Sequence, residues 1–304
     1  MLFRIRHTTR FQYDQAASES HNEVRMRPLD GPGQRCVEFA LDVYPGSSAL
    51  EYDDYYGNRV QAVSVDQPHD ALVIEARSLV ERVPEAEAAG ATVTFREFLA
   101  HDSARQRDEY DFLSPSQFVP FSQSMRKFFW IAHPANDEDV AEYTEGIVRF
   151  VRDQFEYEPG LTGVHSSADE ILSVGGGVCQ DFAHLTIGLL RLAGVPARYV
   201  SGYLAPWPNS SGELPVGTRA THAWLEAQLP GLGWIGFDPT HGCRADCRYI
   251  RVAIGRDYAD VPPFKGVFRS AGAKQMMTVE LDIESTNPVE SGGPSGPDQS
   301  QSQQ

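Results

Sequence analysis

Cys179 stands at the junction of a glycine run and an apolar run, in the stretch GGGVCQDFAH (residues 175–184). The apolar residues that follow it cover most of a helical circumference, which predicts a buried helix that ends at Gly194 and Pro196. A cysteine in the first turn of a helix lies at the positive end of the helix dipole, and that position favours the nucleophilic thiolate. The residue is therefore either a reactive thiol or a buried structural cysteine.

A thiol nucleophile needs a base and a group that orients the base. His184 is a poor base, because five residues along one helix turn a side chain by about 140°; we expect it in a core hydrogen bond, and Asp181 fails for a similar reason. His222 begins the predicted strand HAWLEAQL, and Asp238 ends the next predicted strand. A proline follows Asp238 and restricts its backbone to extended geometry. One hairpin separates them, so we predict a catalytic set of Cys179, His222 and Asp238.

Three further residues are candidates for the surroundings of this set. The oxyanion of an acyl-transfer reaction needs preorganised donors, and the backbone N–H of Cys179 is the natural one. The side chain of Gln180 is a candidate second donor, although polar residues in a first turn often face solvent. Trp224 and Tyr203 are candidates to line a cleft, although aromatic residues on strands more often belong to the core.

Length and charge limit the class of protein. The chain has 304 residues, enough for two domains. Its 42 acidic and 26 basic residues give a formal charge of −16, which argues against nucleic acid or an anionic membrane as partner. No apolar run approaches the ~20 residues of a membrane helix, and arginines interrupt the N-terminal segment, unlike a secretion signal. We expect a cytoplasmic protein; the oligomeric state is open.

Four segments follow from the patterns along the chain. Residues 1–84 contain short runs rich in Val, Tyr, Phe and Thr between turn residues, which predicts an antiparallel β-sandwich domain. Residues 85–135 form a connector with short helices. Residues 136–284 begin with helices and continue with strands, which predicts an α+β core with an antiparallel sheet. The segment 285–304 is rich in Pro, Gly, Ser and Gln and is predicted to be disordered.

Two helix starts in the predicted core have candidate caps. Asn136 is a suitable N-cap for a helix with apolar residues at helical spacing from Val140 to Phe155. Ser167 and Glu170 match a capping box for a shorter helix before the glycine run.

A zinc site is the alternative interpretation for a group of His and Cys residues near residue 245. The stretch HGCRADC places His241, Cys243 and Cys247 within seven positions, and zinc sites use these residue types. A second paired cluster is absent from the sequence. Together with Cys36 and Cys179 there are four cysteines, too few in a long cytoplasmic chain to indicate a disulfide framework. We expect free or redox-linked thiols here, and neither a metal nor a cofactor.

Three stretches resemble the bacterial transglutaminase-like family, within the papain-like superfamily. They are GGGVCQDFAHLTIGLLRLAGVPARYVSGYL, THAWLEAQLPGLGWIGFDPTHG and IRVAIGRDYADVPPFKG, and the resemblance covers about residues 136–265. The strand-rich first part resembles the β-sandwich domain that precedes this core in the family. The resemblance implies a papain-like core with Cys179 as nucleophile, His222 as base and Asp238 as orienting acid. His241 departs from the pattern, which has Asn there, and the loop that follows seldom carries cysteines.

The resemblance implies acyl transfer through a thioester, with water or an amine as acceptor. We favour peptidase or amidase hydrolysis, because cross-linking requires an amine to outcompete water and nothing in the sequence indicates a second amine site. Protein-glutamine cross-linking and a non-catalytic peptide-binding scaffold are the alternatives. A complete Cys–His–Asp set argues against the scaffold.

Overall fold

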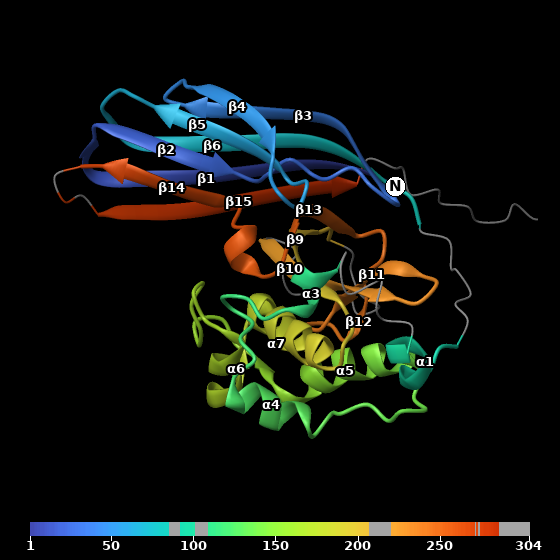
Figure 1. The fold of residues 1–304 in the computed structure, drawn as a ribbon. Helices are drawn as coiled ribbons and strands as arrows, with labels where there is room; N and C mark the ends of the chain where they lie inside the picture. The colour runs from blue at the N-terminus through green and yellow to red at the C-terminus, as the bar shows by residue number, and fades with distance from the viewer. Residues whose placement is uncertain (85–91, 101–108, 207–219, 271, 273, 286–304) are drawn as a thin grey trace, which may run out of the picture.

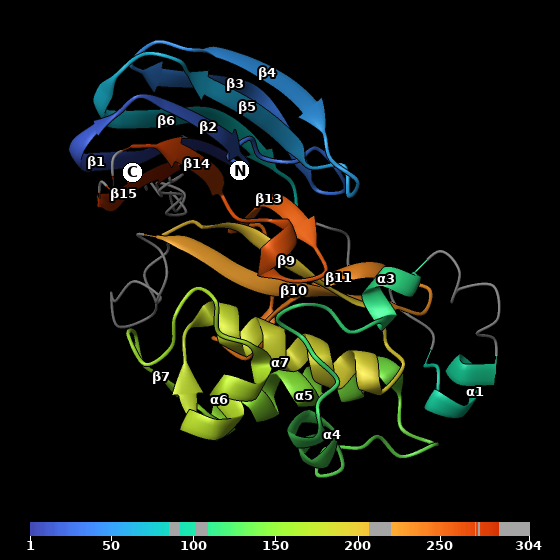
Figure 2. The same ribbon diagram turned by 60° about the vertical axis from the view of Figure 1, so that its left-hand side comes forward.

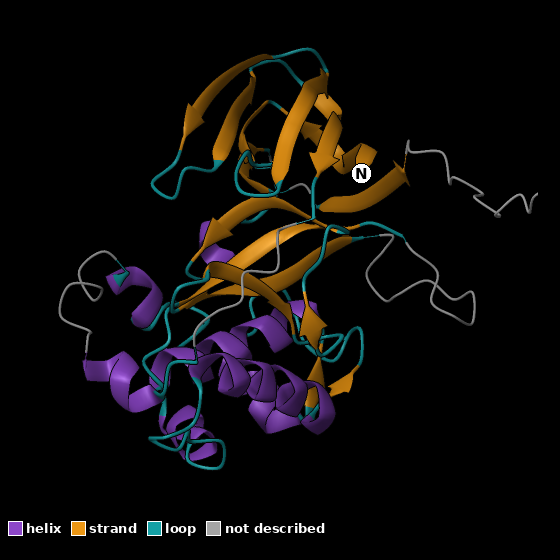
Figure 3. Cartoon of the chain, turned by 90° about the vertical axis from the view of Figure 1, so that its right-hand side faces the viewer, coloured by secondary structure: helices purple, strands orange, loops and turns teal. Residues whose placement is uncertain are grey.

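The computed structural model describes residues 1–84, 92–100, 109–206, 220–270, 272 and 274–285. In these residues the chain forms a β-sandwich and an α+β core. The five-stranded sheet of the core lies between the sandwich and the helices (Figures 1 and 2). Most helical segments gather on the side of this sheet that faces away from the sandwich (Figure 3). The expected α+β architecture is confirmed.

The sandwich consists of two four-stranded antiparallel sheets. One sheet has the order β15 (Gln275–Ser285), β1 (Leu2–Ala17), β6 (His69–Arg82), β3 (Gln34–Tyr44), and the other has the order β14 (Phe264–Arg269), β2 (Glu19–Val24), β5 (Arg59–Val65), β4 (Ser48–Asp53). Buried and exposed residues alternate along β1 and β6, as expected for strands with one face on a core. Phe11, Leu72 and Val63 are among the residues that fill the space between the sheets.

The last two described strands, β14 and β15, belong to the sandwich, which differs from the predicted core boundary at residue 284. β15 pairs with β1 from Phe3↔Ser285 to Tyr13↔Gln275, and β14 pairs with β2. Figure 1 shows both strands in orange to red beside the blue N-terminal strands. The pattern of a strand gives its buried face but not its partner, so pairing between the two ends of a chain leaves no local signal.

The core sheet has the order β12 (Cys243–Arg244), β11 (Gly233–Asp238), β10 (Thr221–Leu229), β9 (Ala197–Leu204), β13 (Tyr249–Gly255), and all its pairs are antiparallel. The three helices that follow the connector are α5 (Val140–Gln154), α6 (Ala168–Val174) and α7 (Cys179–Leu192). Helix α7 lies at the centre: its residues from Gln180 to Arg191 are all buried. The remaining elements are α1 (Phe95–Ala100), α3 (Tyr110–Leu113), α4 (Gln123–Phe129), η1 (Tyr258–Asp260) and the parallel pair β7 (Glu156–Tyr157) and β8 (Gly176–Gly177).

Of the two predicted helix caps, Asn136 is wrong, and Ser167 is confirmed as an N-cap but without a capping hydrogen bond. Helix α5 begins at Val140, and its N-cap is Asp139, whose carboxylate accepts hydrogen bonds from the backbone N–H groups of Ala141 and Glu142. The same carboxylate accepts from Val93 N, so a contact with the preceding segment favours Asp139 over Asn136. Ser167 is the N-cap of α6, but its side chain makes no capping hydrogen bond.

The two units share a small apolar interface. Phe3 and Ile5 of β1 pack with Ile250 and Val252 of β13 in one buried cluster. Residues 286–304, including the predicted disordered tail beyond Ser285, and residues 85–91 and 101–108 of the connector lie outside the described part of the chain. Among the described helices, none combines the length and apolarity required to cross a membrane.

Candidate active site

The glycine run before Cys179 ends one helix and makes room for the start of the next. Gly175 closes α6 in the left-handed conformation, with φ 84°. At Gly177 a Cβ would lie 2.6 Å from Asp181 Oδ2. That carboxylate accepts a hydrogen bond from Val178 N at 2.9 Å and so caps α7. The arrangement starts the helix at Cys179, which is half-buried.

Gly177→Ala is expected to destabilise the protein by about 1–3 kcal/mol, because the new methyl group must displace the buried Asp181 carboxylate. The matched control is Gly146→Ala in α5, where a Cβ meets no atom within 4 Å. The control should leave stability unchanged or raise it by about 0.5–1 kcal/mol. Urea denaturation measures both free energies of unfolding, and equal effects would refute this account of the helix start.

The structure brings Cys179, His222 and Asp238 together from three elements. His222 lies on β10 and Asp238 ends the neighbouring β11. The distance from His222 Nε2 to Asp238 Oδ2 is 2.7 Å, and the two residues are 2% and 0% exposed. The other ring nitrogen, Nδ1, has no hydrogen-bond partner that meets strict geometry among the described residues, while the Cys179 thiol interacts with this imidazole. Asp238 is therefore hydrogen-bonded to Nε2 of His222, and Nδ1 is the ring nitrogen that is available to the thiol.

The charges of this set stabilise an imidazolium. Burial alone lowers the pKa of His222, but the Asp238 carboxylate and, after it, the Cys179 sulfur outweigh burial and raise the pKa. Burial likewise raises the pKa of Asp238, but His222 and His241 outweigh it, so the pKa lies below its usual range. Around neutral pH the arrangement therefore favours a charged His222–Asp238 pair. An adjacent imidazolium favours the thiolate form of a cysteine.

Asp238 has more partners than the sequence indicated. Its Oδ2 also lies 2.6 Å from His241 Nδ1 and accepts a hydrogen bond from the Tyr249 hydroxyl at 2.8 Å. Its Oδ1 accepts from Thr240 N at 2.8 Å. His241 was noted in the sequence as a departure from the family pattern, which has Asn at this position. No local sequence pattern indicated that Tyr249 on β13 contacts Asp238. Every oxygen of the buried carboxylate thus has a donor, which a buried charge requires.

The three secondary candidates lie in different places. The Gln180 side chain is buried, and its Nε2 donates to Val164 O at 3.1 Å, so this donor holds the loop before α6. Trp224 is buried beside His222, and the centroids of the two rings are 6.2 Å apart. Tyr203 does not line the site: its hydroxyl lies 2.9 Å from His7 Nδ1, and it packs in the cluster between core and sandwich. His184, as expected, is buried and accepts a core hydrogen bond from the backbone N–H of Tyr258.

Two tyrosines near the thiol were missed by the sequence analysis. Tyr157 pairs with Gly177 in the β7–β8 ladder, and burial together with the charges of Cys179 and Asp238 raises its pKa to about 12. Tyr199 on β9 is fully buried, and burial, with Cys179 as the next cause, raises its pKa. A two-residue strand such as β7 is too short to carry a periodic signal.

The three residues of the alternative zinc interpretation contact different partners. The Cys247 sulfur lies 3.4 Å from Met1 Sδ and the Cys243 sulfur 3.7 Å from the Tyr249 hydroxyl, while His241 contacts Asp238. Within the described residues, the side chains close enough to share a metal ion are those of His222, Asp238 and His241, with ligand atoms within 4.8 Å of one another. Two imidazoles and a carboxylate are donors that zinc accepts. Their 2.6–2.7 Å contacts are hydrogen-bond distances.

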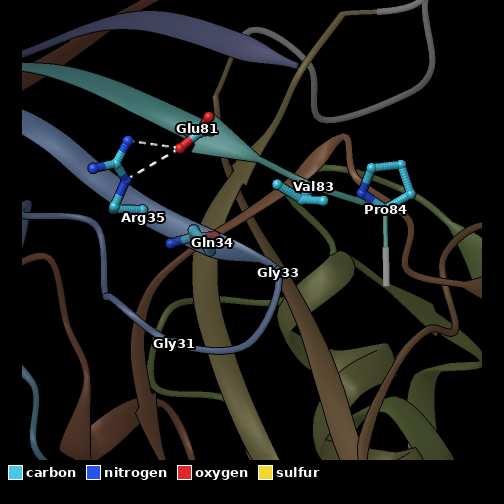
Figure 4. A pocket seen from close by; sticks show the side chains of 7 residues that line it. All are labelled: Gly31, Gly33, Gln34, Arg35, Glu81, Val83 and Pro84. Atoms are coloured by element: carbon cyan, nitrogen blue, oxygen red, sulfur yellow. Dashed lines mark hydrogen bonds and ion pairs between the residues drawn. The ribbon is translucent and has the colours of Figure 1, made fainter. Parts of the chain in front are cut away.

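A surface pocket of about 480 Å³ lies elsewhere, on the sandwich. Figure 4 shows the residues that line it, which are Gly31, Gly33, Gln34, Arg35, Glu81, Val83 and Pro84. The Arg35 guanidinium binds the Glu81 carboxylate at 2.9 Å on its wall. The lining includes none of the residues around Cys179, so this pocket is not part of the candidate active site.

A cysteine at the first residue of a buried helix, beside His and Asp on an antiparallel sheet, is the arrangement found in papain-like folds. Residues 3–81 match the bacterial transglutaminase-like N-terminal region, and residues 131–239 match the transglutaminase-like superfamily. The chain belongs to the bacterial transglutaminase-like family, as its sequence motifs predicted.

Some similar proteins match most of the chain, and others match only part of it. An uncharacterised protein of Mycobacterium leprae is 34% identical over 276 residues, which cover 91% of this chain and 96% of that protein. A protein-glutamine gamma-glutamyltransferase of Pseudomonas aeruginosa is 36% identical over 96 residues, 31% of this chain and 14% of that protein. A Cytophaga hutchinsonii protein, named as a candidate cysteine protease, shares the fold with a TM-score of 0.69 and 24% identity, over 95% of this chain and 92% of that one.

Proposed function

We propose that the protein hydrolyses amide bonds of a peptide or protein through a thioester on Cys179. The observation that carries the proposal is the placement of Cys179 at the start of α7 beside a buried His222 whose Nε2 lies 2.7 Å from Asp238 Oδ2. Membership of the transglutaminase-like family supports cysteine-based acyl chemistry.

In the proposed reaction each group has a role. The Cys179 thiolate attacks the amide carbonyl carbon, and the backbone N–H groups at the start of α7 stabilise the oxyanion. The His222 imidazolium gives its Nδ1 proton to the leaving amine, and the C–N bond breaks to leave the thioester. His222 then takes a proton from water, whose oxygen attacks the thioester and releases the acid and the thiolate. Asp238 keeps the Nε2 proton in place throughout, so that Nδ1 is the nitrogen that exchanges protons.

Hydrolysis is favoured over transfer for a chemical reason. Transfer requires an amine to react faster than water at the thioester, and the sequence indicates no site to hold one. The local similarity to a gamma-glutamyltransferase supports transfer as the second candidate. We also propose a cytoplasmic place of action, because all four cysteines are free thiols, which suits a reducing compartment.

Mass spectrometry of a peptide library incubated with the protein in ¹⁸O-water, with and without a primary amine, tests the proposal. We expect new carboxyl groups that carry ¹⁸O, no product with Cys179→Ser, and normal product with Cys36→Ser, whose thiol lies on the sandwich strand β3. Amine adducts in place of acids would establish transfer instead. Peptides bound but left intact by the unaltered protein would establish a non-catalytic scaffold.

A further inference from the structure

Two imidazole rings contact the same carboxylate oxygen in this site. Asp238 Oδ2 lies 2.7 Å from His222 Nε2 and 2.6 Å from His241 Nδ1. The centroids of the two rings are 5.6 Å apart. The proposed reaction uses His222 and leaves the second ring without a role.

We propose that His241 is a positioning residue for the reaction, and this inference rests on the proposed function. Its Nδ1–H donates to Asp238 Oδ2 and, together with the Tyr249 hydroxyl, holds that oxygen where it meets His222 Nε2.

The aspartate needs such support because its carboxyl torsion is soft. Rotation about the terminal torsion of Asp has broad minima, so the donors around the group decide where each oxygen points. Thr240 N fixes Oδ1 at 2.8 Å. The oxygen that serves the base, Oδ2, is fixed by side chains alone, those of His241 and Tyr249, apart from His222 itself.

A turn directs His241 back onto the carboxylate. Gly242 N donates to Asp238 O at 2.8 Å, which closes the turn after β11. His241 N lies 3.4 Å from Asp238 Oδ1 in the same turn. A residue three positions after Asp238 is thereby placed with its ring beside Oδ2. The sequence DPTHG supplies the aspartate and the donor within one local unit.

The surroundings of the second ring nitrogen, Nε2, indicate that His241 acts through Nδ1. When Nδ1–H donates to the carboxylate, a neutral ring leaves Nε2 as an acceptor. That atom is buried and has no hydrogen-bond partner among the described residues. An unsatisfied buried polar atom destabilises a fold. Hydrogen bonds of Nε2 therefore do not account for a histidine at this position. Among the described residues, the hydrogen bond that the ring makes is the one from Nδ1 to Asp238.

Kinetics of three variants test the inference with the peptide that the unaltered protein cleaves. His241→Phe keeps the ring and removes the donor, and His241→Asn shortens the side chain but keeps an N–H donor. His133→Ala is the control, since that exposed ring stacks on Trp130. We expect His241→Phe to lower kcat about tenfold or more with KM and Tm little changed, because a hydrogen bond to a charged group is lost. His241→Asn should recover most of kcat, and the control should match the unaltered protein.

Normal kcat in His241→Phe, or no recovery in His241→Asn, would overturn the inference while hydrolysis by the unaltered protein still stands. If His241→Phe does not fold, His241→Ala with the same comparison to His241→Asn replaces it. Failure of the proposed function gives a different result, because the unaltered protein would then show no turnover that depends on Cys179.

Discussion

Asp238→Asn is expected to lower turnover by up to ~10⁴-fold while the fold and the Cys179 thiol stay in place. An asparagine can present its amide N–H to His222 Nε2, where the aspartate presents only acceptor oxygens. The imidazole then carries its proton on the wrong nitrogen for exchange with the substrate. Steady-state kinetics with the cleaved peptide measure the loss, and unchanged circular dichroism shows that the fold is retained.

The same substitution should move the pH profile in a defined direction. In the unaltered protein the Asp238 charge is the main factor that raises the pKa of His222 against the effect of burial. Without that charge the lowering by burial remains, so His222 loses its proton at a lower pH. The alkaline limb of kcat/KM should therefore shift to lower pH in Asp238→Asn.

Asp246→Asn is the matched control for both readouts. Its carboxylate is on the exposed loop after β12 and binds the Arg248 guanidinium at 2.7 Å, away from the base. We expect kinetics and pH profile equal to those of the unaltered protein. If Asp238→Asn behaves like this control, the orienting role of Asp238 is wrong.

Local patterns in the sequence were sufficient to predict the elements that carry Cys179, His222 and Asp238. The change from glycines to an unbroken apolar run predicted a helix that starts at Cys179, and α7 starts there. The strand that begins with His222 and the strand that ends with Asp238 were visible from their alternation and from the proline after the second. Each of these features depends on residues that are neighbours along the chain.

Features that depend on tertiary contacts were not predictable in the same way. The pairing of β15 with β1 joins the first and the last described strands, which are far apart along the chain. The hydroxyl of Tyr249 reaches Asp238 from β13, and Tyr203 turns toward His7 on the sandwich. In each case the residue type was visible in the sequence, but the partner depended on how the sheets pack.

Cys179 is expected to be the cysteine that reacts fastest with iodoacetamide near neutral pH. Its position at the helix start and the adjacent His222 imidazolium both favour the thiolate, which is the nucleophile. Two other cysteines are internal controls, because burial raises the pKa of the Cys36 thiol and of the Cys243 thiol. Replacing His222 with alanine removes the positive partner, so alkylation of Cys179 should slow.

The measurement is the alkylation rate of every cysteine by mass spectrometry, from about pH 5 to 9, in the unaltered protein and in His222→Ala. His165→Ala, which changes an exposed ring stacked on Phe118, is the control for loss of a histidine. The account predicts that Cys179 reacts well ahead of Cys36 at about pH 6, and that this lead is lost in His222→Ala and kept in His165→Ala. Equal rates for Cys179 and Cys36 in the unaltered protein, or an undiminished lead in His222→Ala, would contradict the catalytic assignment.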